Sequence, residues 1–315
     1  MYNRARTTVV IAILAAQYGC TPDKGSVVSV GEPNDVEIVA RGLKFDAPTE
    51  IPAGWTTFHF KNESQMTHFA LIQKLPQGIG LADQQEQVAP VFQNGMNLLN
   101  EAKADEAMQV FGTLPAWFGE IVFMGGPGFV SAGGVATTTL NLQPGNYLLE
   151  CYVKTGGIFH SFNPSPDSIG MVAEFEVTGD STAANPPEAT FTVTISKAGG
   201  IEFDGAPTPG KHIVEVQFGE QQTHENFVKH DLHLVRLAPD TDLEVLQTWM
   251  DWREMTGLET PAPATFVGGT NEMPAGSTAY LHLDFEPGEY AWIAEVPESA
   301  SKGMMKKFLV GASAH

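Results

Sequence analysis

The chain has little cysteine and few positive charges. Its 315 residues include two cysteines, Cys20 and Cys151, and 17 lysines and arginines against 37 aspartates and glutamates, which gives a formal net charge of −20. Proteins that bind nucleic acid neutralise phosphates with Lys and Arg, so this composition argues against a nucleic-acid partner. An acidic surface favours a basic protein partner, although the same charge also serves solubility alone.

Long apolar runs are scarce as well. The run Thr8–Ala16 follows two arginines and is too short to cross a bilayer comfortably, so residues 1–20 are typical of a secretory signal. Gly19 before Cys20 resembles a bacterial lipoprotein cleavage site, whereas Gln17 fits that pattern poorly and plain secretion is the alternative. We therefore expect an exported protein of the bacterial cell envelope, either periplasmic or held at the membrane surface by lipid on Cys20.

The second cysteine then stands alone. If Cys20 is lipidated or removed, Cys151 cannot form an internal disulfide. A free thiol in an oxidising compartment is a liability unless it has a function. The residues around Cys151 are therefore the place to look for chemistry.

Cys151 belongs to a strand–loop–strand pattern. Residues 144–153 and 170–177 both alternate as strands, and the loop between them carries His160. Two glutamates mark the outer face of the second strand, which places Met171 on the buried face. A thiol, an imidazole and a thioether thus lie in one unit, and a copper electron-transfer site needs these three and a second imidazole.

The second imidazole has a candidate upstream. Residues 57–61 alternate, with His59 on the outer face, and the turn-prone residues 62–64 end this strand. His68 is predicted to open the next strand. A lone histidine at a strand start is usually structural, but here it competes for the vacant ligand position.

The composition predicts a mostly β fold. The chain has 32 Gly and 21 Pro together with β-branched runs, as turn-rich β proteins do. Helical spacing is found at residues 81–111, whose methionines are expected to fill the core. A capping box at 241–244 also predicts a short helix through Trp249 and Trp252 that ends near Gly257.

The second half of the chain repeats the first after a linker at residues 179–189. We expect a signal segment at 1–20, a tether at 21–35, a first domain at 36–178 and a second domain at 190–311. The matching segments are 42–48 with 200–207, 67–75 with 229–237, 123–126 with 266–269, 144–147 with 287–290, and 170–172 with 303–305.

The repeat differs at the chemical positions. Ala294 stands where the first copy has Cys151, while His230 and Met304 keep the places of the first imidazole and the thioether. His230 and its neighbour His233 are therefore predicted to be structural. Without a thiolate, the second copy is expected to bind no copper.

Together these motifs resemble the cupredoxin superfamily, in particular plastocyanin-like bacterial exported proteins. The resemblance covers about 36–178, and 190–311 as a degenerate copy, and it implies two tandem Greek-key β-sandwich domains with short helical insertions. The residues that carry it are Phe60-Lys61-Asn62 with His68 six positions after Asn62, Pro144-Gly145-x-Tyr147 leading to Cys151, and Gly170-Met171-Val172.

The resemblance also implies a ligand set. Carried over from cupredoxins, the ligands of one copper per chain are His68, Cys151, His160 and Met171, and Asn62 braces the ligand loop by hydrogen bonds. Met171 lies eleven residues after His160, which is longer than usual. A packing role for Met171, with copper left three-coordinate or hydrated, stays open.

The expected function is single-electron transfer through a mononuclear blue-copper-type site, with a redox protein as partner. We expect no enzyme, because the sequence offers no nucleophile–base–acid constellation. The alternative is a copper carrier, or a metal-free binding or assembly module without a redox role.

Overall fold

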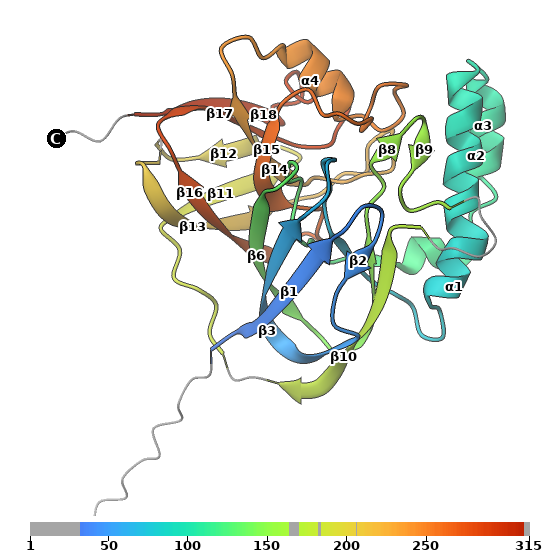
Figure 1. Ribbon diagram of the computed structural model, residues 1–315, viewed down its shortest axis with the longest axis horizontal. Helices are drawn as coiled ribbons and strands as arrows, with labels where there is room; N and C mark the ends of the chain where they lie inside the picture. Colours follow the sequence, from blue (N-terminus) through green and yellow to red (C-terminus); the bar gives the residue numbers. More distant parts are fainter. Residues whose placement is uncertain (1–31, 164–169, 182–183, 206, 312–315) are drawn as a thin grey trace, which may run out of the picture. The chain divides into compact units, whose positions relative to one another are not determined.

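The computed structural model describes residues 32–163, 170–181, 184–205 and 207–311; the expected signal segment and Cys20 lie outside them. The described chain is mostly β, as predicted (Figure 1). The strands of the first half are β1 (Asn34–Ala40), β2 (Phe45–Asp46), β3 (Glu50–Asn62), β4 (Leu71–Lys74), β5 (Val122–Phe123), β6 (Val135–Leu142), β7 (Gly145–Glu150), β8 (Lys154–Thr155), β9 (Ile158–Phe159) and β10 (Val172–Ser181).

The second half adds eight strands, and the helices are short. The strands are β11 (Phe191–Ser196), β12 (Gly200–Phe203), β13 (Gly210–Phe218), β14 (Leu232–Leu237), β15 (Thr265–Thr270), β16 (Thr278–Phe285), β17 (Gly288–Ile293) and β18 (Met305–Val310). The helices are α1 (Leu81–Asp83), the π-helical η1 (Gln84–Val88), α2 (Ala89–Asn100), α3 (Ala104–Phe111), the 3₁₀ turn η2 (Ala116–Glu120) and α4 (Leu243–Trp249). Within this part of the chain, no helix is both long enough and apolar enough to cross a bilayer.

Each half contains the same two sets of paired strands. In the first half, β3 pairs with β1 in parallel and with β6 in antiparallel fashion, and β7 lies between β4 and β10. In the second half, β13 pairs in the same two ways with β11 and β16, and β17 lies between β14 and β18. The internal repeat that the sequence predicts is therefore present in the strand pairing.

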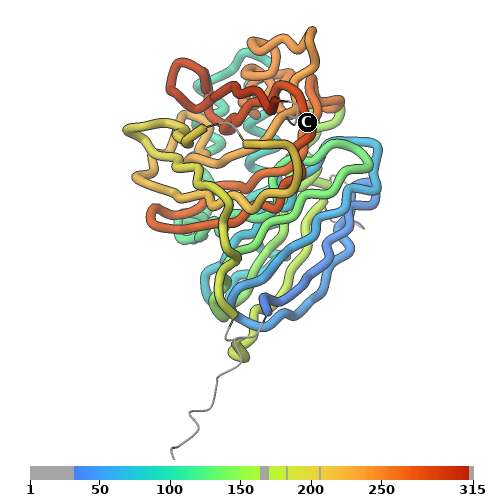
Figure 2. The backbone as a smooth tube through the Cα atoms, turned by 90° about the vertical axis from the view of Figure 1, so that its left-hand side faces the viewer, coloured from blue at the N-terminus to red at the C-terminus, as the bar shows by residue number. Residues whose placement is uncertain are grey.

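The two halves share one sheet. Strand β6 of the first half pairs in antiparallel fashion with β16 of the second, where Thr137–Thr139 face Tyr280–His282. The Thr139 hydroxyl lies 2.8 Å from Nε2 of His282, so a side-chain contact accompanies the backbone pairing. Figure 2 shows the strands of the first half, in blue and green, beside those of the second, in yellow to red. Most of the buried apolar side chains of both halves form one continuous core, and a small separate cluster surrounds Leu148.

The helical segment at 81–111 forms as predicted, but with a break. Ala102 has a φ of 57° between α2 and α3, which ends the first of these two helices. Met96 on α2 is fully buried, as expected of a core methionine, and α2 and α3 pack on each other. Met108 on α3 is 57% exposed, so the expectation that it fills the core is wrong.

The expected helix in the second half is shorter than predicted. Asp242 caps α4 by accepting hydrogen bonds from the backbone N–H groups of Glu244 and Val245. The helix ends at Trp249, because the backbone N–H of Leu258 donates to the Trp249 carbonyl and turns the chain back. This long-range bond has no local signal in the sequence.

A glycine turn holds the segment that precedes β4. Gly126 has a φ of 111°, and a Cβ atom there would lie 2.0 Å from the carbonyl oxygen of Ala70. The close approach lets Ala70 donate its backbone N–H to Pro127 over 2.9 Å. His68 lies before this segment and forms an isolated bridge with Val130. The next strand, β4, begins three residues later at Leu71, so the prediction that His68 opens a strand is wrong.

Candidate metal centre

Three of the predicted ligands converge in the first half. Nδ1 of His68 lies 3.4 Å from Sγ of Cys151, and Nδ1 of His160 lies 4.0 Å from the same sulfur. The two imidazole rings are 5.0 Å apart at an angle of 55°. All three side chains are buried. Among the described residues, they form the one group of three or more His, Cys, Asp or Glu side chains whose ligand atoms lie within 4.8 Å of one another.

Backbone hydrogen bonds fix the ligand-bearing segments. Cys151 directly follows β7, and its N–H donates to the carbonyl of Met171 over 3.1 Å. His160 directly follows β9, and its N–H donates to Val153 over 2.7 Å. His68 exchanges two backbone hydrogen bonds with Val130, at 3.2 and 2.8 Å. Each ligand is therefore placed by a strand end or a bridge and not by a free loop.

Asn62 braces the loop that leads to His68, as the resemblance implies. Its side-chain amide is buried and donates to the carbonyls of Met66 and Val130 over 2.7 and 3.0 Å. Its Oδ1 accepts from the backbone N–H and the hydroxyl of Ser64. Because every polar atom of Asn62 has a partner, the turn is held in one conformation.

Met171 contacts the centre through its backbone. Its N–H donates to the carbonyl of His160 over 2.6 Å, and its own carbonyl accepts from Cys151. The side chain is fully buried. These bonds tie the second strand to two of the ligands, and the role of the Met171 thioether as an axial ligand stays a prediction.

The donor set fits one copper ion. Ligand atoms held at the ordinary 2.0–2.3 Å around a three-coordinate first-row metal lie roughly 3.5–4 Å from one another. The two distances from Sγ of Cys151, 3.4 and 4.0 Å, match that spacing. Two imidazoles and a thiolate are also the donors that copper electron-transfer sites use. His68, Cys151 and His160 could therefore hold one copper ion.

Burial keeps the three groups uncharged in the metal-free protein. It lowers the pKa of His68 to about 4 and that of His160 to about 3, the nearby His68 adding to the second shift. It raises the pKa of Cys151 to about 12, against backbone hydrogen bonds from Phe69 and Val153 that favour the thiolate. Neutral imidazoles are ready to bind a metal, and a bound cation displaces the thiol proton.

Residues of the second half form hydrogen bonds with the β8–β9 hairpin, which leads into His160. The sequence did not indicate these contacts. The Lys154 N–H donates to Leu258 over 2.7 Å, and the Thr260 N–H donates to Lys154 over 2.9 Å. The Thr155 hydroxyl lies 2.9 Å from Nε2 of His160 and 2.7 Å from the Thr260 hydroxyl. More than 100 residues separate Lys154 and Thr155 from Leu258 and Thr260, so no local pattern could reveal these contacts between the halves.

Lys154 anchors the same hairpin from inside. It is fully buried, and its Nζ donates to the carbonyls of Trp252 and Glu254 over 3.0 and 2.8 Å. Burial lowers its pKa to about 8. Lys154 lies three residues after Cys151, and its ammonium group thus satisfies two backbone carbonyls of the second half.

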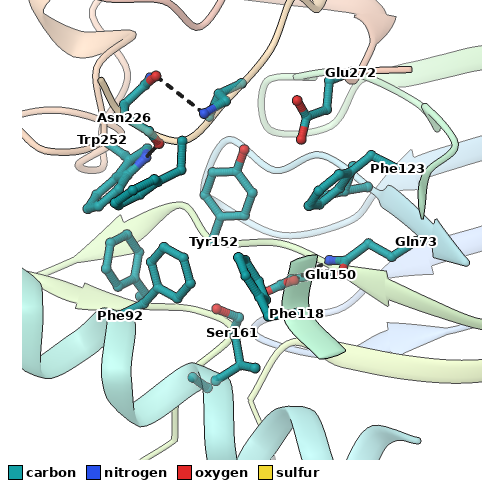
Figure 3. A pocket seen from close by; sticks show the side chains of 16 residues that line it. Gln73, Phe92, Phe118, Phe123, Glu150, Tyr152, Ser161, Asn226, Trp252 and Glu272 are labelled. Atoms are coloured by element: carbon teal, nitrogen blue, oxygen red, sulfur yellow. Dashed lines mark hydrogen bonds between the residues drawn. The ribbon is translucent and has the colours of Figure 1, made fainter. Parts of the chain in front are cut away.

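A cavity of about 80 Å³ is lined by residues next to two of the three converging side chains (Figure 3). Glu150 and Tyr152, on either side of Cys151, line it, as does Ser161 beside His160. Figure 3 shows aromatic side chains from both halves around this space. The residues that line the cavity thus flank Cys151 and His160 in the sequence. The aromatic residues that line the cavity are Phe92, Phe118, Phe123, Tyr152, Phe159, Phe227 and Trp252.

No family model and no curated protein matches this chain. Solved structures that resemble it include auracyanin A, a "blue" copper protein of Chloroflexus aurantiacus, with 24% identity and a TM-score of 0.28 over 46% of this chain and 99% of that one. An azurin of Methylomonas sp. strain J has 10% identity and a TM-score of 0.28 over 39% of this chain and 96% of its own.

A multicopper oxidase resembles a longer part of the chain. The likeness covers 88% of each chain, with 16% identity and a TM-score of 0.22. The solved structures thus include copper proteins of the kind that the sequence resembles, but TM-scores this low carry no conclusion about function. The case for copper rests on the three converging side chains.

Proposed function

We propose that the protein is an exported electron carrier that holds one copper ion in its first half and exchanges single electrons with a redox protein. The observation that carries the proposal is the buried convergence of two Nδ1 atoms on Sγ of Cys151, at 3.4 and 4.0 Å. Copper held by such donors supplies one-electron chemistry by cycling between Cu(I) and Cu(II).

The residues of the chain would hold and tune the ion. His68, Cys151 and His160 bind it, and the backbone N–H groups of Phe69 and Val153, which face the sulfur, adjust its electron density. Burial of all three ligands keeps water and small oxidants away. Ligands fixed by backbone hydrogen bonds need move little when the charge of the ion changes, which favours electron transfer over release of the metal.

An electrochemical experiment tests the proposal. The copper-loaded protein is oxidised and reduced repeatedly while its visible spectrum and its bound copper are measured. The proposal predicts a reversible one-electron wave with copper retained through every cycle. Loss of copper on reduction would support the copper-carrier alternative, and a protein that takes up no copper would support the metal-free binding module.

Export and partner choice are parts of the same proposal. Cys20 lies outside the described residues, and mass spectrometry of the N-terminal peptide decides whether it carries lipid. An unmodified mature terminus at another residue would contradict anchoring. The formal net charge of −20 favours a basic redox partner, so reduction by such a partner should slow as salt screens the attraction.

A further inference from the structure

A second pair of histidines lies in the second half of the chain. His224 and His230 have ring centroids 5.2 Å apart at an angle of 47°. The ligand pair His68 and His160 has nearly the same arrangement, at 5.0 Å and 55°. The sequence placed His230 at the position of His68 but gave no reason to connect His224 with it.

The ring nitrogens of this pair have no partners. His224 is 9% exposed and His230 is fully buried. None of their four ring nitrogens has a hydrogen-bond partner among the residues that the structure describes. Buried polar atoms are nearly always satisfied, so four unpaired nitrogens side by side point to a ligand that bridges them.

The surroundings repeat the first centre with its thiolate removed. The Ala294 N–H donates to Met304 over 2.9 Å, as Cys151 donates to Met171. The Met304 N–H donates to Ser299 over 2.7 Å, as Met171 donates to His160. Ala294 and Ser299 thus occupy the backbone places of the cysteine and the second histidine, and His224 supplies an imidazole from another loop.

That loop is braced as firmly as the first. The buried Asn226 donates its side-chain amide to the carbonyl of Glu295 over 2.9 Å, and its own carbonyl accepts from the Trp252 indole over 2.7 Å. The His224 N–H donates to Val228 over 2.9 Å, which closes a turn just before His230. The two rings are therefore held together before any ligand arrives.

We propose that His224 and His230 form a second metal site that binds one Cu(I) ion, with the thioether of the buried Met304 as the third donor. Two imidazoles and a thioether are neutral donors, and soft thioether ligands select Cu(I). A divalent ion in so buried a place would need an anionic ligand to offset its charge.

The two carboxylates whose charges act on this pair, Asp231 and Glu225, already have partners. Both oxygens of Asp231 are engaged, one by Nε2 of His233 and the other by the N–H of Glu295. Glu225 pairs with Lys302 at the exposed edge, at 3.3 Å. A monovalent ion therefore suits this site better than Zn(II) or Cu(II). The expectation of one copper per chain rested on only two ligands in the second half, His230 and Met304. His224, whose ring lies beside that of His230, adds a third.

Titration of the full-length chain with Cu(I), under anaerobic conditions and against a competing colorimetric chelator, tests the site. We expect two Cu(I) per chain for the wild type and one for a variant with His224→Gln and His230→Gln, whose thiolate-dependent colour with Cu(II) stays unchanged. His212→Gln, at a half-exposed histidine of β13, is the matched control and should keep two. One Cu(I) in the wild type, or two in the double variant, would overturn the proposal.

A spectroscopic measurement on the wild type avoids any effect of substitution on folding. With ¹⁵N-labelled histidine, the imidazole resonances of His224 and His230 should shift on addition of Cu(I). Resonances that stay in place at saturating Cu(I), or that shift with Zn(II) and not with Cu(I), would overturn the assignment. The result does not depend on electron transfer by the first centre, because His68 and His160 give separate resonances.

Discussion

Thr155 contacts His160 on the side of the ring that faces away from the cysteine. The hydroxyl lies 2.9 Å from Nε2, while Nδ1 of the same ring lies 4.0 Å from Sγ of Cys151. With Nε2 protonated and donating to the hydroxyl, the lone pair of Nδ1 is directed at the site. Thr155 is thus a positioning residue, and its contact with Thr260 makes the second half of the chain part of the support.

Replacement of Thr155 by valine keeps the shape of the side chain and removes the hydroxyl. Because partners of this kind orient metal ligands, Thr155→Val should lower copper affinity by roughly 10–100-fold and shift the visible spectrum, with the fold retained. Competition titrations measure the affinity, and circular dichroism monitors the fold. Thr155→Ser, which keeps a hydroxyl, should restore most of the affinity; equal affinities for all three proteins would show that the contact has no role at the metal.

Met171→Leu tests the fourth proposed ligand. The substitution conserves volume in a fully buried position, so stability should fall by less than about 1.5 kcal/mol. An axial thioether tunes the reduction potential, so the potential and the visible bands should change while the colour remains. Met250→Leu, at another fully buried methionine, is the control for packing and should leave the spectrum as it is. If the spectrum of Met171→Leu is the same as that of Met250→Leu and of the wild type, the role of Met171 is packing alone.

Lys154→Ala should destabilise the fold strongly. The change leaves a cavity and removes the donor from two backbone carbonyls in the interior, which together cost about 3 kcal/mol or more. Urea unfolding measures the loss. Lys61→Ala, which removes an exposed ion pair with Glu37, is the comparison and should change stability by no more than about 0.5 kcal/mol. Similar losses in the two variants would contradict a structural role for the buried ammonium group.

Glu272, which lines the cavity, should make stability depend on pH. Burial raises its pKa from 4.5 to about 7 in the folded protein. Between these values the folded state keeps a proton that the unfolded state has lost, so the free energy of unfolding falls as pH rises, by about 3 kcal/mol in all from this group.

The variant Glu272→Gln isolates that contribution. An amide oxygen can still accept the hydrogen bond from the Lys229 N–H, while the titrating group is gone. Urea unfolding at pH 5 and pH 8 should therefore show a smaller decrease than in the wild type. Glu202→Gln, at an exposed glutamate, should leave the decrease unchanged. A decrease as large in Glu272→Gln as in the wild type would refute the assignment.

The sequence predicts the local parts of this protein better than the distant contacts. Alternation identifies the strands around Cys151, and the short spacing to His160 places both ligands in one unit. His68 comes from a motif whose bracing Asn62 forms the expected bonds. The bond that ends α4 at Trp249 joins residues whose proximity depends on the finished fold, as do the Thr155–Thr260 contact and the His224–His230 pair, so no local pattern indicates them.

The visible and electron paramagnetic resonance spectra of the protein loaded with Cu(II) test the central claim most directly. We predict an intense sulfur-to-copper charge-transfer band that is absent in Cys151→Ser and retained in His59→Gln, a change at a half-exposed histidine outside the centre. Cys151→Ser should keep its circular dichroism spectrum, because the site is small relative to the core. A colourless wild-type protein under full copper loading, or a band that survives Cys151→Ser, would contradict a thiolate copper centre.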